Sequence, residues 1–192
     1  MPKTETDPRY AAGIAHGANV LRALAHAIDS LGDSAARTDF APPLDHVSAR
    51  DALTLLSWRG RTPAPAIEEA LGLSQSACVR LLDRLQAAGL TARERAPRDR
   101  RVWVALTNDG EHAARQIIAA TSGTLQDLVS KALPDARQLF PALELLDRIA
   151  IAAVGDAVDP SRFCRACDPA ACLAEGQTCP SDRACDANSA AG

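Results

Sequence analysis

LGLSQSACVRLLDRLQAAGLTARERAPRDRRVWVALTNDGE, residues 71–111, is the stretch with the clearest pattern in this 192-residue chain. A short helix over 66–71 is expected to end at the glycine that follows it. Ser74 is placed to accept a hydrogen bond from the first turn of a longer helix over 75–88, and Gly89 is placed to end that helix. The pattern therefore predicts two helices joined by a tight turn.

The longer helix is predicted to have one buried face and one exposed face. Its apolar positions, expected to be buried at helical spacing, are Val79, Leu82 and Leu85. The positions expected to face solvent are Gln75, Ser76, Arg80, Arg84 and Gln86.

A β-hairpin is predicted directly after these helices. Residues 90–95 and 102–106 have the composition of short strands, and residues 96–101 form a charged loop between them. Two helices at a tight turn, followed by a hairpin with a basic tip, make a winged helix-turn-helix.

Positive charge is concentrated in this motif. Between residues 74 and 101 there are seven arginines and three acidic residues, a surplus of four positive charges, whereas the whole chain has a formal net charge of −3. A local surplus of this kind favours contact with DNA phosphates. The alternative is that these arginines only solvate an exposed helix and hairpin, and the two-helix motif in front of them favours DNA.

The candidate DNA-reading residues lie at the start of the longer helix, along its exposed face and in the loop. The first turn of a recognition helix reaches base edges or phosphates, and here it supplies Ser74, Gln75 and Ser76. The remaining candidates are Arg80, Arg84, Arg98, Asp99, Arg100 and Arg101. Asp99 is expected to orient Arg101 through an ion pair, because a carboxylate repels DNA.

Three further positions in the hairpin are interpreted less specifically. Trp103, on the returning strand, is expected to fill the core rather than to stack on a base. Arg93 and Arg95 are left open between DNA contact and simple exposure on a strand.

The stretch 71–111 resembles the core of the MarR family of transcriptional regulators. The most specific match is Arg98-Asp99-Arg100-Arg101 followed by Leu106-Thr107-x-x-Gly110, which resembles the family's wing and the start of its next helix. In helix order the resemblance extends over roughly residues 10–155. It implies a homodimeric repressor whose second helix, Ser74 to Ala88, enters the major groove while the wing, with the pair Asp99 and Arg101, reaches the minor groove.

The flanking segments are predicted to be helical. Helices are expected over 10–31, 48–58, 107–133 and 143–155, with a linker over 32–44 and a break between Pro134 and Pro141. The long end helices have apolar stripes that a small DNA-binding module cannot cover. Two chains that interleave these helices would bury the stripes, so a homodimer is expected.

The predicted fold class is mainly α (α+β): a winged helix-turn-helix with a helical dimerisation base and a small Cys-rich metal-binding tail. The domains are expected to be an N-terminal dimerisation helix and linker over 1–44, the DNA-binding domain over 45–110, the C-terminal dimerisation helices over 111–157 and the tail over 158–192.

The tail carries five of the six cysteines, four of them spaced Cys-x2-Cys-x4-Cys-x6-Cys-Pro: Cys164, Cys167, Cys172 and Cys179. Four thiolates can hold an iron–sulfur cluster (2Fe-2S or 4Fe-4S) or a zinc ion, and redox disulfides are a third alternative. The proline after the last ligand favours the cluster. Ordinary MarR-family members stop near residue 155, so this tail departs from the resemblance.

Composition limits the remaining function classes. The N-terminus has no signal-like apolar stretch and no apolar run approaches about 20 residues, so a cytoplasmic protein without a membrane segment is expected. No catalytic constellation is visible, so an enzyme is not expected. The leading hypothesis is a DNA-binding regulator controlled by the cluster. Alternatives are a regulator with a structural zinc tail and a small organic effector, or an electron-transfer or metal-handling module that docks a protein partner.

Overall fold

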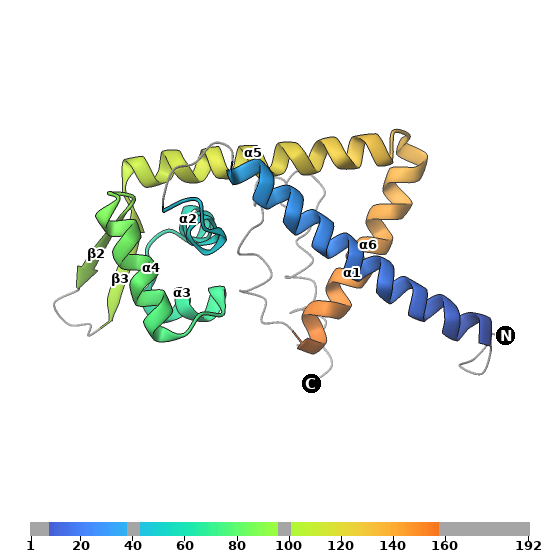
Figure 1. Ribbon diagram of the computed structural model, residues 1–192, viewed down its shortest axis with the longest axis horizontal. Helices are drawn as coiled ribbons and strands as arrows, with labels where there is room; N and C mark the ends of the chain where they lie inside the picture. The colour runs from blue at the N-terminus through green and yellow to red at the C-terminus, as the bar shows by residue number, and fades with distance from the viewer. Residues whose placement is uncertain (1–7, 38–42, 96–100, 158–192) are drawn as a thin grey trace.

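The computed structural model describes residues 8–37, 43–95 and 101–157, and it is an elongated molecule with one compact lobe (Figure 1). The elements follow in the order α1 (Pro8–Arg37), α2 (Val47–Arg59), β1 (Thr62–Pro63), α3 (Ala64–Leu71), α4 (Gln75–Ala87), β2 (Thr91–Arg95), β3 (Val102–Leu106), α5 (Asn108–Ala132) and α6 (Ala136–Ala157). The lobe holds α2 to β3 and the start of α5. The mainly helical winged-helix fold that the sequence predicts is confirmed.

The lobe has one apolar core under a small antiparallel sheet. Leu53, Leu55 and Leu56 of α2 are fully buried with Ile67 of α3 and Val104 of β3. The sheet has the strand order β1-β3-β2, with Thr91 opposite Leu106 and Arg95 opposite Val102. The sequence predicted only the β2–β3 hairpin. β1 is two residues long and contains a proline, so it has no alternating pattern from which it could be predicted.

The turn between α3 and α4 has the expected cap chemistry. Gly72 has φ +63°, a left-handed conformation that glycine adopts without steric cost, and its N–H donates to carbonyls at the end of α3. Ser74 caps α4, since its side chain accepts a hydrogen bond from the Ala77 N–H at 3.4 Å. This short turn fixes the angle between α3 and α4 within the lobe.

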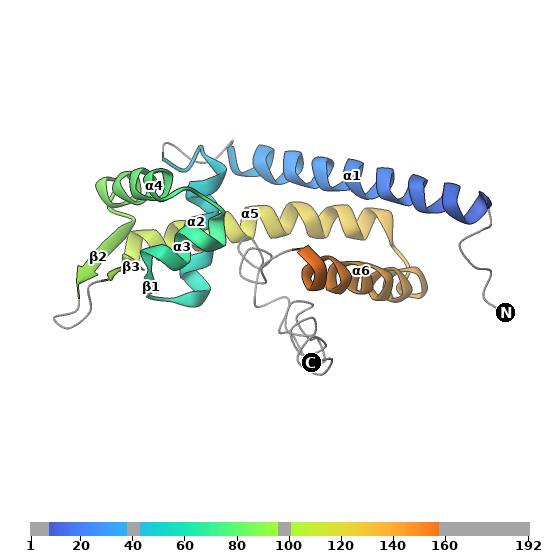
Figure 2. The ribbon, with the colours of Figure 1, turned by 90° about the horizontal axis from the view of Figure 1, so that it is seen from below.

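The long helices α1 and α5 extend out of the lobe, and α6 follows the end of α5. Figure 2 shows α1 and α6 on opposite sides of α5, and the N-terminal end of α1 extends beyond the end of α5. α5 packs against α2 inside the lobe and against α1 outside it, whereas α6 packs extensively against no other described element. Apolar side chains of α1 and α6 are therefore exposed, with Ile14 at 59% and Phe140 at 64%.

Two expectations about these helices are wrong. α1 continues to Arg37 although a linker was expected from residue 32, and α6 runs through Pro141 although a break was expected there. Gly32 and Asp33 are poor helix formers but do not forbid a helix. Pro141 stands near the start of α6, where losing one backbone N–H costs the helix a single hydrogen bond. No helix of the described residues is long and apolar enough to span a membrane.

The start of α5 is held against the end of α4 by a close backbone approach. A Cβ built at Gly110 would collide with the Leu90 carbonyl oxygen, and it would lie 2.9 Å from the Leu90 carbonyl carbon and 3.3 Å from Leu106 Cδ2. Thr107 caps α5 by accepting from the Gly110 N–H at 3.1 Å. Only glycine therefore fits at position 110, the third residue of α5.

We predict that Gly110→Ala destabilises the protein by about 1–3 kcal/mol, because the new methyl group must displace the backbone of Leu90. The measurement is urea unfolding at fixed protein concentration. Gly123→Ala is the matched control in the same helix, since nothing lies within 4 Å of its Cβ position. The control should be neutral or stabilising by up to about 1 kcal/mol. Equal effects of the two substitutions would contradict the close approach.

Candidate nucleic-acid interface

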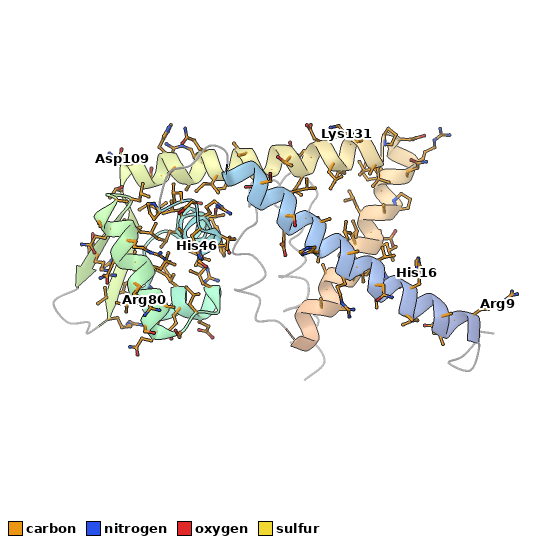
Figure 3. The ribbon with its side chains drawn as sticks, in the orientation of Figure 1. Arg9, His16, His46, Arg80, Asp109 and Lys131 are labelled. Atoms are coloured by element: carbon orange, nitrogen blue, oxygen red, sulfur yellow. The ribbon has the colours of Figure 1, made fainter. Side chains whose placement is uncertain are left out.

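The exposed face of α4 is the surface of the lobe that lies opposite α5, and Figure 3 labels Arg80 there. Gln75, Ser76, Arg80, Arg84 and Gln86 are exposed, as predicted. The Ser74 and Ser76 hydroxyls lie 3.4 Å apart at the helix start. The first turn thus presents hydroxyl and amide groups to solvent, with an arginine one turn further along.

The buried face of α4 is rotated relative to the prediction. Leu82 and Leu85 are buried as expected, but Val79 is 47% exposed and Cys78 and Leu81 are buried in its place. The stripe at positions 78, 81, 82 and 85 follows helical spacing as well as the predicted one does. Cys78 is small enough to fit under Ala64, whose carbonyl oxygen lies 3.9 Å from the thiol sulfur.

Arg93 of β2 is bound to α4 and is not directed at solvent. Its Nη1 lies 2.7 Å from Asp83 Oδ1, and its Nη2 donates to the Val79 carbonyl oxygen at 3.3 Å. These contacts fix the base of the hairpin against the middle of the recognition helix. They also neutralise Asp83, the acidic side chain on the exposed face of α4, which would otherwise repel phosphate.

The base of the wing is built around Trp103. The guanidinium carbons of Arg61 and Arg101 lie 4.7 Å and 5.3 Å from the centre of its ring, within the range of cation–π attraction. Arg61 Nε also lies 3.1 Å from Glu94 Oε2, on the residue paired with Trp103 in the sheet. Trp103 is half-buried and Val104 fills the core, so the expectation that Trp103 fills the core is wrong.

A hollow of about 480 Å³ lies between α4 and the start of α2. Its lining includes His46 and Ser48 from the α2 side and Arg80 and Arg84 from α4. His46 caps α2 by accepting from the Ser48 N–H at 3.4 Å. The proximity of these two residues to the recognition helix could not be predicted from local patterning, because Ser48 and Arg80 are 32 positions apart in the chain.

Cys78 is a poorly reactive thiol. It is 2% exposed, and burial raises the pKa of the Cys78 thiol above its ordinary value, with a further increase from the Glu68 carboxylate and a decrease from Arg93. Because the thiolate is the reactive form, both effects that raise this pKa disfavour oxidation at neutral pH. Cys78 therefore belongs to the core of the lobe.

The other predicted site residues fall outside the described part of the chain. Arg98, Asp99 and Arg100 belong to residues 96–100, and Cys164, Cys167, Cys172 and Cys179 belong to residues 158–192. Arg101 is described and exposed at the base of the wing. Within residues 8–37, 43–95 and 101–157, no three His, Cys, Asp or Glu side chains gather to hold a metal ion.

Comparisons with known proteins give one consistent result. The model of the MarR family matches residues 49–102, which run from α2 to the start of β3. No curated protein matches the chain. The matched family comprises transcriptional regulators and not enzymes.

Solved structures share this fold. A MarR family protein from Bacillus stearothermophilus superposes with a TM-score of 0.62 at 20% identity, covering 72% of this chain and 94% of that one. RV1404 from Mycobacterium tuberculosis has a TM-score of 0.59 at 21% identity, covering 71% and 92%. The reduced form of MarR from E. coli has a TM-score of 0.56 at 23% identity, covering 67% and 95%.

Proposed function

We propose that this chain, whose residues 49–102 match the MarR family of winged-helix regulators, is a homodimeric transcriptional repressor with a Cys-ligated iron–sulfur cluster that controls its affinity for operator DNA. The observation that carries the DNA-binding part is the exposed, Ser74-capped face of α4 beside the arginine-bearing base of the wing.

Two parts of the lobe support this proposal, the first turn of α4 and the base of the wing. The first turn of α4 can enter the major groove, where hydroxyl, amide and guanidinium groups reach base edges. Arg101 directly precedes the returning strand of the wing and follows Arg98, Asp99 and Arg100 in the sequence. Arginine at that position suits a narrow minor groove, whose negative potential attracts it. Asp83 does not oppose this binding, since Arg93 neutralises it.

A second copy of the chain would complete the helical base. Apolar side chains of α1 and α6 remain exposed, among them Val20, Leu24, Leu143, Leu145 and Leu146. Such faces in one molecule indicate an interface, and a twofold dimer would bury the same face of both protomers. The dimer would also set the distance between two recognition helices and hence the half-site spacing of the operator.

The four cysteines of the tail supply the proposed sensor. The tail follows α6 in the sequence, and its proposed ligands Cys164, Cys167, Cys172 and Cys179 begin seven residues after Ala157, the last residue of α6. Metal binding by a short segment couples its binding free energy to local folding. Cluster loss or oxidation would then alter the base and, through it, the separation of the two recognition helices. Cys78 is too protected to act as the sensor itself.

One structural feature favours the alternative of a structural zinc tail and a small organic effector. A hollow of about 490 Å³ lies between the end of α2, β3 and α5, with Leu56, Leu106 and Ile118 as its apolar lining and Arg61 and Arg115 at its edge. Apolar walls with a few polar groups are the usual composition of a ligand site. A colourless protein that contains one zinc per chain would support this alternative over the cluster.

The DNA-binding proposal predicts that an arginine of the wing contributes to DNA affinity and that an exposed arginine of α5 does not. Operator DNA is first selected from random duplexes with the full-length protein. Arg101→Ala should weaken binding to every sequence and lower the slope of log affinity against log salt by about one, because one phosphate contact is lost. Arg115→Ala is the control, since this exposed arginine of α5 pairs with Glu111 away from α4. If both variants bind like the original protein, the proposed wing contact is wrong.

The dimer proposal predicts that Leu146→Glu separates the protomers, because a carboxylate would be buried without a partner in the base. The expected cost is about 2–5 kcal/mol, which raises the dimer dissociation constant at least tenfold. Sedimentation velocity over a concentration series measures this constant. The control is Val47→Glu, at an equally exposed apolar residue of the winged lobe, which should remain dimeric. A monomeric original protein would refute the proposal.

The cluster proposal predicts a brown protein after anaerobic purification, with iron and acid-labile sulfide. Cys164→Ser or Cys167→Ser should remove the visible absorption, since each removes a ligand. Cys185→Ser is the matched control in the same tail and should leave the spectrum unchanged. Loaded and cluster-free proteins should then differ in affinity for the selected operator at the same salt concentration. Equal affinities would show that the cluster does not control operator binding.

A further inference from the structure

One apolar side chain stands on the polar face of the recognition helix. In the winged lobe, the large apolar side chains of the described residues 43–95 and 101–106 are buried or half-buried, except Val47 at 51% and Val79 at 47% exposure. The other exposed large apolar side chains belong to α1, α5 and α6, where the dimer base would cover them. Val79 lies on a surface that the proposed dimer leaves open.

The position of Val79 on α4 places it with the residues that would read DNA. It is three residues after Ser76 and four after Gln75, so the three side chains are neighbours on one side of the first two turns. Arg80, next in sequence, is also exposed. If the first two turns of α4 enter the major groove, Gln75, Ser76 and the two methyl groups of Val79 would therefore reach the base edges together.

Packing inside the protein does not account for Val79. Its carbonyl oxygen accepts from Arg93 Nη2 at 3.3 Å, and the same guanidinium binds Asp83 one turn later at 2.7 Å. These bonds hold this turn of α4 to β2 while the core side of the helix is occupied by Cys78 and Leu82. The valine side chain is thus held outward by a clamped backbone.

We infer that Val79 is a specificity-determining residue that contacts the C5-methyl group of a thymine in each operator half-site. This methyl group is the apolar feature of the major-groove base edges, and apolar side chains contact it in protein–DNA complexes. The contact removes apolar surface from water on both sides. Cytosine and uracil lack the methyl group, so Val79 selects thymine at one position. This inference rests on the proposed function, since it requires α4 to enter the major groove.

The test replaces thymines of the selected operator one at a time by deoxyuridine, which removes the methyl group and leaves the hydrogen-bonding groups in place. The full-length protein should lose about three- to tenfold in affinity at one thymine per half-site. Val79→Ala should bind the thymine and deoxyuridine operators equally. Val79→Thr, which keeps one methyl group at the same branch point, should retain part of the difference.

Val47→Ala is the matched control, at the other exposed valine of the lobe, and it should keep the full sensitivity to the thymine methyl. Thermal unfolding should show that Val79→Ala is folded, because the side chain contributes little to the core. If no single thymine methyl affects binding, or if Val79→Ala keeps the same sensitivity, the inference is wrong while DNA binding stands. If no duplex is selected at all, the proposed function itself fails.

Discussion

The rest of the molecule depends on the junction where α4, the wing and α5 meet. The Thr107 hydroxyl donates to the Gly89 carbonyl oxygen at 2.6 Å and accepts from the Gly110 N–H at 3.1 Å, while the Thr107 N–H donates to the Leu90 carbonyl oxygen at 3.1 Å. The recognition helix ends at this point, the returning strand ends there and the helix to the base begins there. Because Gly110 leaves no space between α5 and Leu90, the three elements must move together.

A rigid junction turns the base of the molecule into a control point for DNA binding. α5 has 25 residues, which gives a length of roughly 37 Å at 1.5 Å per residue. A small change of tilt at the far end of this helix therefore displaces the recognition helix by a larger distance. A tail joined to α6 needs no contact with DNA to regulate binding, provided that it biases how the two bases pack. If the proposed function holds, this geometry would allow the sensor and the DNA-reading helix to lie in different parts of the molecule.

The helix caps could be predicted from the sequence. The rotation of α4 about its own axis and the contacts between residues distant in the sequence could not. The caps at Ser74 and Thr107 and the glycine at position 72 were predictable because each residue satisfies its own helix end. The exposure of Val79 was not, since a cysteine or a valine fits the same spacing and only the packed core decides between them. The contact of Arg61 with Trp103 joins residues 42 positions apart, and the two-residue strand that brings them together has no pattern of its own.

The structure also changes what the basic charge of the lobe means. Counting residues 74–101 gives four surplus positive charges, as if each arginine were equally available to phosphate. Arg93 is committed to Asp83, and Arg61, which lies outside that segment, is committed to Glu94, so each of these pairs is neutral in the folded protein. The acidic side chains near the DNA face are thus neutralised by arginines that serve the fold. In the described part of the chain, Arg80 and Arg84 on α4 and Arg101 at the wing lie where the proposed function places DNA. Because the Arg93–Asp83 pair removes one positive and one negative charge together, it leaves the surplus of four unchanged. The number of phosphate contacts made by each lobe therefore depends on where the other arginines lie and not on the surplus alone.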